Sequence, residues 1–115
     1  MRDALERTPR LRERVFTAGE RAYCDGRGAA APQHYAARFA AKEAALKALG
    51  TGWSGGVSWR HVEVTNAEGG RPELIFHDRA LELFRRAGAN RAHISISHTS
   101  EHAVAQVVLE RAGGD

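Results

Sequence analysis

One stretch of the chain decides the fold, and it reads His34-Tyr35-Ala36-Ala37-Arg38-Phe39-Ala40-Ala41-Lys42-Glu43-Ala44-Ala45-Leu46-Lys47-Ala48-Leu49. Its residue types favour a helix, and Gly50 follows as a helix-stopping residue. At about 100° per residue, one apolar stripe is formed by Tyr35, Phe39, Leu46 and Leu49. Lys42 lies inside that stripe, and alanine covers most of the remaining circumference. We therefore expect a helix that is packed from several sides.

The segments around this helix predict short strands and further helices. Alternating apolar residues predict one β-hairpin over 61–65 and 72–77, and a second over 92–98 and 103–109. Apolar periodicity predicts a helix over 78–87. Thr17 and Glu20 have the spacing of a capping box, which predicts a short helix that ends near Cys24. The sequence therefore predicts one α+β domain over residues 1–115, with an antiparallel sheet packed on the alanine-rich helix.

Composition narrows the class of protein. The chain has 115 residues, 43% hydrophobic and 27% charged, which argues against a disordered chain. No apolar run approaches the roughly 18 residues of a membrane span, and the N-terminus lacks the apolar region of a signal peptide, so we expect a cytoplasmic protein. The single Cys24 excludes an intramolecular disulfide and a cysteine-based zinc cluster. A net charge of +3 suits an acidic partner, a phosphorylated ligand or nucleic acid, without choosing among them.

Two segments carry side chains that could do chemistry. Glu43 and Lys47 are spaced i, i+4 on the helix, where a carboxylate could hold a divalent cation and an ammonium could meet a phosphate. Spacing alone favours a helix salt bridge. In the strand over 95–99, three hydroxyls on one face and His98 at the tip could bind an anion. A polar outer face with a satisfied histidine is the interpretation that we favour there.

Together, these segments resemble the holo-[acyl-carrier-protein] synthase family of small 4′-phosphopantetheinyl transferases, over 14–110. The segments that carry the resemblance are Arg38-Phe39-Ala40-Ala41-Lys42-Glu43-Ala44, Lys47-Ala48, Gly50-Thr51-Gly52, Gly70-Arg71-Pro72, Arg14-Val15-Phe16-Thr17 and Ile94-Ser95-Ile96-Ser97-His98-Thr99. The resemblance implies the phosphopantetheinyl transferase fold. It also implies transfer of the phosphopantetheine arm of coenzyme A to a serine of apo acyl carrier protein, with release of 3′,5′-ADP.

The resemblance also implies roles for residues of this chain. Glu43 is expected to be catalytic and a Mg²⁺ ligand, and Lys47 to be catalytic through the phosphates. The general base would be Glu43 or a metal-bound water. The expected coenzyme A contacts are Arg38, Lys42, Ser97, His98 and Thr99, with Arg38 and His98 at the 3′-phosphoadenosine end and Lys42 near the phosphates.

The family also implies partners. An acidic acyl carrier protein is expected to dock on a basic first helix, over about 2–14, which Pro9 interrupts. The basic residues expected to contact it are Arg2, Arg7, Arg10 and Arg14. A homotrimer, a role in fatty-acid biosynthesis and no membrane partner are further expectations. Nucleic acid is not an expected partner, because the arginines are scattered and the strands carry few aromatics for stacking.

One departure from the family concerns the N-terminus. Family members normally begin with an apolar, glycine-containing strand whose aspartate is a second Mg²⁺ ligand. This chain begins at Met1-Arg2-Asp3, which aligns inside the following helix. We favour a start assigned at an internal methionine, because every later motif is intact. The alternative is an inactive or truncated carrier-protein-binding module without a complete metal site.

Overall fold

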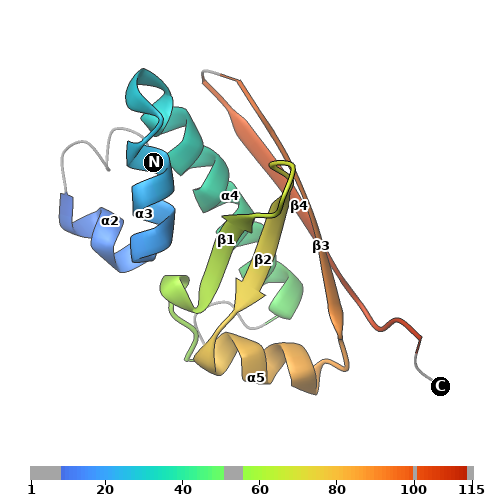
Figure 1. Ribbon diagram of the computed structural model, residues 1–115. Helices are drawn as coiled ribbons and strands as arrows, with labels where there is room; N and C mark the ends of the chain where they lie inside the picture. The colour runs from blue at the N-terminus through green and yellow to red at the C-terminus, as the bar shows by residue number, and fades with distance from the viewer. Residues whose placement is uncertain (1–8, 51–55, 100, 114–115) are drawn as a thin grey trace.

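Helix α4, Ala31–Leu49, runs through the middle of the molecule (Figure 1). The computed structural model describes residues 9–50, 56–99 and 101–113. The helix begins three residues earlier than the predicted His34, because Pro32 lies in its first turn, where a missing N–H costs nothing. It ends as predicted at Gly50, whose φ of 82° is left-handed and whose N–H bonds the Lys47 carbonyl.

Two antiparallel hairpins flank α4. Strands β1 (Val62–Asn66) and β2 (Pro72–Phe76) pair with Val64 opposite Leu74. Strands β3 (Arg91–His98) and β4 (Ala103–Glu110) pair along their whole lengths. The hairpins lie side by side, with β2 next to β3, and α4 packs mainly against β4 (Figure 1). The predicted antiparallel α+β arrangement is confirmed, as two adjacent two-stranded ladders.

The remaining helices are short. Helix α2 (Pro9–Val15) starts at the predicted break, and residues 1–8 lie outside the described part. Helix α3 (Ala18–Asp25) has the predicted capping box, with Thr17 and Glu20 bonded in both directions. A 3₁₀ turn, η1 (Gly28–Ala30), leads into α4, and another, η3 (Trp59–His61), precedes β1. Helix α5 (Asp78–Arg86) follows β2.

The core lies around α4, as its alanine-rich surface predicts. Ala41 and Ala45 are fully buried, which lets α3 and the strands approach the helix backbone closely. The phenol ring of Tyr35 packs edge-on against Phe16 at 4.9 Å between ring centres. Within the described ranges, no helix is long and apolar enough to cross a membrane.

Cys24 lies in this core and is expected to be inert in the folded protein. Burial raises the pKa of its thiol to about 12, so the reactive thiolate is scarce at neutral pH. We expect a thiol reagent such as dithionitrobenzoate to leave native protein unlabelled at pH 8 and to label one thiol in urea. Rapid labelling without denaturant would contradict the burial.

Candidate active site

Glu43 projects from α4 into a cavity of about 290 Å³ beside the turn between β3 and β4. Its side chain is exposed, and Thr99, Glu101 and His102 of the turn line the same cavity. The turn is closed by the Thr99 N–H, which donates to the His102 carbonyl at 2.8 Å. The Thr99 hydroxyl accepts from the N–H groups of Glu101 and His102. Thr99 and Glu43 therefore line the same cavity, one from the end of β3 and the other from α4.

Lys47 lies one helical turn beyond Glu43 on the same side of α4, and both side chains are exposed. In the part of the chain that the structure describes, no ion pair joins them. The salt bridge that their spacing favoured is therefore not formed. An exposed carboxylate and an exposed ammonium, both uncompensated, are available for a ligand that carries a cation and phosphates.

The oxygen atoms at this cavity fit a magnesium ion. Mg²⁺ prefers oxygen ligands and is usually held by one or two carboxylates, with substrate phosphates and waters completing its shell. Glu43 supplies one carboxylate at the cavity wall, and Glu101 supplies a second. Among the described residues no group of three or more acidic, histidine or cysteine side chains forms a self-contained metal cage. The donor set thus suits a metal that arrives with its phosphate substrate.

Arg38 and His98 line a second cavity, of about 180 Å³, on another face of α4. The Arg38 side chain is only 5% exposed, and its Nη2 donates to Asn66 Oδ1 at 2.6 Å. Its guanidinium lies 3.9 Å from the centre of the Tyr23 ring, which favours a cation. His98 ends β3, so it stands one residue before Thr99 of the first cavity. Arg38 and His98 therefore line one cavity, and Glu43 and Thr99 line the other.

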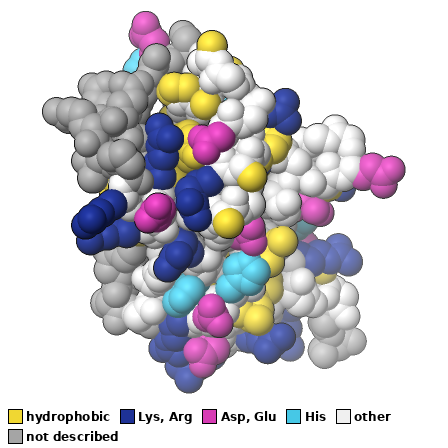
Figure 2. Space-filling model, turned by 60° about the vertical axis from the view of Figure 1, so that its left-hand side comes forward, with side chains coloured by type: hydrophobic (Ala, Val, Ile, Leu, Met, Phe, Trp, Pro, Cys, Tyr) yellow, Lys and Arg dark blue, Asp and Glu magenta, His cyan; other side chains and the backbone are white. Residues whose placement is uncertain are grey.

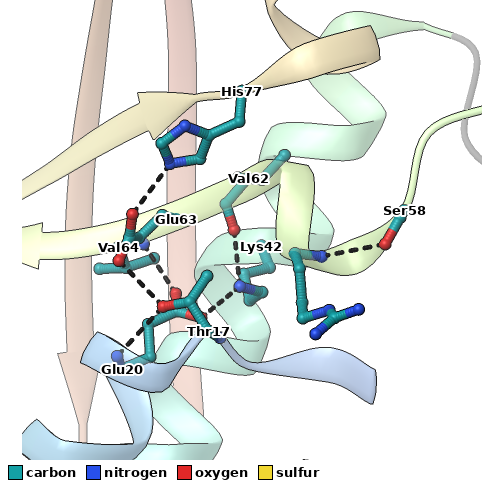
Figure 3. Close-up of polar contacts among 9 residues, drawn as sticks. Thr17, Glu20, Lys42, Ser58, Val62, Glu63, Val64 and His77 are labelled. Atoms are coloured by element: carbon teal, nitrogen blue, oxygen red, sulfur yellow. Dashed lines mark hydrogen bonds and ion pairs between the residues drawn. The ribbon is translucent and has the colours of Figure 1, made fainter. Parts of the chain in front are cut away.

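Lys42 does not face either cavity, and its expected role needs correction. Its ammonium is fully buried and donates to Glu20 Oε1 at 2.5 Å and to the Val62 carbonyl at 2.6 Å (Figure 3). Burial lowers the pKa of Lys42, and the adjacent Glu20 carboxylate opposes that shift. An enclosed ammonium with these partners cannot reach substrate phosphates. Lys42 therefore joins α4 to α3 and β1. Its position inside the apolar stripe of the helix was the feature of the sequence that indicated burial.

Glu20 is the residue that sequence reasoning missed at this junction. The capping box revealed one of its contacts, the bond from the Thr17 N–H to Oε1. Its other oxygen accepts from the Val64 N–H at 2.7 Å (Figure 3). Above it, Glu63 accepts from the Thr17 hydroxyl and pairs with His77 at 2.9 Å. Burial would raise the pKa of Glu63, but the hydrogen bonds from His77 and Thr17 bring it below its usual value.

The remaining predicted residues fall outside the two cavities. Ser97 is exposed on the outer face of β3 and lines neither cavity, which matches the polar-face interpretation of this strand. Arg10 and Arg14 are exposed on α2. Figure 2 shows one face of the molecule, on which basic side chains gather among acidic ones. Arg2 and Arg7 lie outside the described residues. His34, Asn66 and Glu101 are further cavity residues that no motif indicated.

Comparison with known proteins shows the family. A model of the 4′-phosphopantetheinyl transferase superfamily matches residues 1–107. A holo-[acyl-carrier-protein] synthase from Geobacter sp. (strain M21) is 54% identical over 101 residues, which cover 88% of this chain and 80% of that protein. The counterpart from Geotalea daltonii is 51% identical over 106 residues, covering 92% and 84%.

Solved structures show the same fold. A holo-(acyl-carrier-protein) synthase from Bacillus anthracis, in complex with CoA (3′,5′-ADP), superposes with a TM-score of 0.75 at 39% identity, over 96% of this chain and 90% of that one. The enzyme from Neisseria meningitidis gives a TM-score of 0.81 at 30% identity, over 95% and 86%. With this fold, and with motif residues grouped at two adjoining cavities, the chain belongs to the 4′-phosphopantetheinyl transferase superfamily.

Proposed function

We propose that this chain is a holo-[acyl-carrier-protein] synthase that transfers 4′-phosphopantetheine from coenzyme A to a serine of apo acyl carrier protein. The observation that carries this proposal is the pairing of the Glu43–Thr99 cavity with the Arg38–His98 cavity at the end of β3. Coenzyme A has two separated anionic groups, a pyrophosphate and a 3′-phosphate. Two adjoining sites, one suited to a metal–phosphate group and one cationic, match that pattern.

The reaction is a phosphoryl-type transfer. The serine oxygen forms a bond to the β-phosphorus of the pyrophosphate, and the bond from that phosphorus to the bridging oxygen breaks. The electron pair leaves with 3′,5′-ADP, and the serine proton passes to a general base, either the Glu43 carboxylate or water. Lys47 binds the phosphates and offsets the negative charge that develops on them. Arg38 and His98 hold the 3′-phosphoadenosine end, and the Thr99 hydroxyl donates to a phosphate oxygen.

Mg²⁺ is part of this proposal, with Glu43 as its protein ligand. When bound, the ion would act as a Lewis acid that polarises the phosphate oxygens and orients the leaving group. Glu43 must be ionised and unpaired to serve, and among the described contacts it has neither an ion pair nor a hydrogen bond.

Intact-mass spectrometry tests the proposal directly. Apo acyl carrier protein incubated with this chain, coenzyme A and Mg²⁺ is expected to gain one phosphopantetheine arm, and EDTA is expected to abolish the gain. An unchanged carrier mass, from a chain shown to be folded by circular dichroism, would favour the alternative of a carrier-protein-binding module without a complete metal site. Mg²⁺-dependent binding of coenzyme A separates the two, because the binding module would show none.

The carrier protein is proposed to dock on the basic face of α2. Charge reversal by Arg10→Glu and Arg14→Glu together is expected to raise KM for acyl carrier protein by about tenfold, since rim charges act mainly on association. The KM for coenzyme A is expected to stay unchanged. Raising the salt concentration should weaken binding of acyl carrier protein to the original protein more than binding to the variant. Equal salt dependence of the two would argue against docking on α2.

A homotrimer with active sites between subunits is also proposed. Val104 and Val108 are 65% and 60% exposed on the outer face of β4, an apolar surface that association would cover. Sedimentation is expected to give a trimer, and Val108→Asp to dissociate it. A monomeric original protein would refute this part of the proposal.

The proposed compartment and pathway follow from the resemblance to the family. We place the protein in the cytoplasm, in fatty-acid biosynthesis, because its proposed substrates are coenzyme A and an acidic carrier protein. Conversion of the fatty-acid carrier in cell extract, at a rate comparable with that of purified carrier, is the measurement that tests this assignment.

A further inference from the structure

The elbow between α2 and α3, residues 15–17, carries the helix on which the carrier protein is proposed to dock. Val15 and Phe16 of the elbow are buried in the core, and Thr17 follows them as the N-cap of α3. Apolar burial holds the elbow to the core but is non-directional, so it does not by itself fix the angle at which α2 leaves the elbow. Hydrogen bonds are directional, and those of Thr17 are therefore the contacts that can fix this angle.

The Thr17 hydroxyl rests on the carboxylate of Glu63. It donates to Glu63 Oε2 at 2.9 Å, and His77 Nε2 lies 2.9 Å from Glu63 Oε1 (Figure 3). Burial favours the neutral form of Glu63, but the hydrogen bonds from His77 and Thr17 keep its pKa below the usual value, so the group is a carboxylate at neutral pH. Glu63 belongs to β1 and His77 directly follows β2. The hairpin of β1 and β2 therefore holds the elbow.

Two features of the surroundings give this contact its room and its importance. A Cβ added at Gly19, in the first turn of α3, would lie 3.2 Å from Glu63 Oε2, closer than most real Cβ contacts. Glycine at this position thus lets the first turn of α3 approach the carboxylate. On the opposite side, Thr17 and His77 line a cavity of about 500 Å³. The elbow borders open space there, where Glu63 supplies the contact that supports it.

We propose that Glu63 is a positioning residue for carrier docking: through the Thr17 hydroxyl it fixes the angle at which α2 presents its arginines. His77 orients the carboxylate that does so. The inference rests on the proposed function in taking α2 as the surface on which the carrier docks. Because Arg10 precedes the elbow by about 10 Å of helix, a tilt of α2 by about 10° would move it by about 2 Å. Such a displacement separates charges that must meet those of an acidic partner.

Two variants of Glu63 separate the effect of position from the effect of charge. Glu63→Ala removes the support of the elbow. Glu63→Gln keeps it, because the glutamine oxygen accepts from Thr17 while its amide donates to His77 in the other tautomer. Both variants remove one negative charge, which by itself would tighten binding of an acidic carrier. Loss of position therefore predicts weaker carrier binding in Glu63→Ala alone, opposite in sign to the effect of charge.

Carrier binding without coenzyme A tests the inference, because no transfer can occur. Fluorescently labelled apo acyl carrier protein is titrated with each variant, and its anisotropy gives the dissociation constant. Glu63→Ala is expected to raise that constant by about fivefold, and Glu63→Gln to leave it close to the original value. The dissociation constant for coenzyme A, from calorimetry, should stay unchanged in both. Glu73→Ala is the matched control, because it removes an exposed carboxylate of the same hairpin that lines a different cavity.

Hydrogen exchange reports how firmly α2 is held, without any partner. The Phe16 N–H donates to the Arg12 carbonyl at 2.8 Å and is expected to exchange about tenfold faster in Glu63→Ala, relative to amides of α4. A general loss of stability would instead speed exchange in α4 to the same extent. If Glu63→Ala does not fold, Gly19→Ala replaces it, because the added methyl group displaces the carboxylate, and the same two results are expected.

Several results would overturn the inference. They are unchanged or tighter carrier binding in Glu63→Ala, equal weakening in Glu63→Gln, unchanged exchange at Phe16, and no carrier binding by the original protein. Phosphopantetheine transfer by the original protein, with carrier binding unaffected by Glu63→Ala, would refute this inference and leave the proposed function standing. Carrier binding that Glu63→Ala weakens, by a chain without transfer activity, would do the reverse.

Discussion

Replacing Glu43 by glutamine is expected to lower kcat/KM for phosphopantetheine transfer by about 10²–10³-fold, which is the effect of removing a group that stabilises transition-state charge. Glutamine keeps the size of the side chain and removes the negative charge that a cation requires. Because Glu43 is exposed, the free energy of unfolding should change by less than about 0.5 kcal/mol. The measurements are the initial rate of carrier modification across Mg²⁺ concentrations and a urea unfolding curve.

The matched control is Glu82→Gln, an exposed glutamate on α5 that pairs only with Arg79 among the ion pairs of the described residues. It removes the same charge far from the two cavities, so the rate should be unchanged. If excess Mg²⁺ restored the Glu43→Gln variant to the full rate, Glu43 would contribute to metal affinity alone. If the rate did not fall at any Mg²⁺ concentration, the assignment of Glu43 would be wrong.

The two lysines of α4 are expected to behave in opposite ways. Lys42→Met should destabilise the protein by about 3–5 kcal/mol, because it leaves the Glu20 carboxylate buried without its counter-charge. Lys47→Met should change stability by less than about 0.5 kcal/mol, because that ammonium is exposed, while lowering the transfer rate strongly. Urea unfolding and the transfer assay on both variants check this contrast.

A double-mutant cycle shows whether loss of the pairing with Glu20 causes the destabilisation of the Lys42→Met variant. Glu20→Gln alone should also destabilise, since Lys42 then lacks its partner. The double variant Glu20→Gln with Lys42→Met should lose less than the sum of the two single changes. Additive losses would mean that the pair acts independently. A Lys42→Met variant that is as stable as the original and loses only phosphate binding would return Lys42 to the substrate site.

Much of the fold was predictable because its signals are local. The end of α4 at Gly50 and the capping box at Thr17 depend on residues within four positions of each other. The hairpins follow from period-two alternation and from turn residues between the strands. The predicted start of α4 was three residues too late, because a helix tolerates proline in its first turn, where Pro32 lies.

The sequence by itself predicted the family and the α+β class, because motifs and hydrophobic periodicity depend on residue types at short, fixed spacings. The candidates Glu43, Lys47, Arg38 and His98 came from the resemblance to the family that those motifs carry. The tertiary structure alone decided which residues are buried and which contact one another. It paired Lys42 with Glu20, which is 22 positions away, and it brought His34 from the start of α4 to His98 at the end of β3. Such contacts depend on how α3, α4 and β3 pack, since burial and neighbouring charge are properties of the assembled core. Two adjacent residues, Lys42 and Glu43, were therefore given opposite environments, one enclosed by protein and the other exposed.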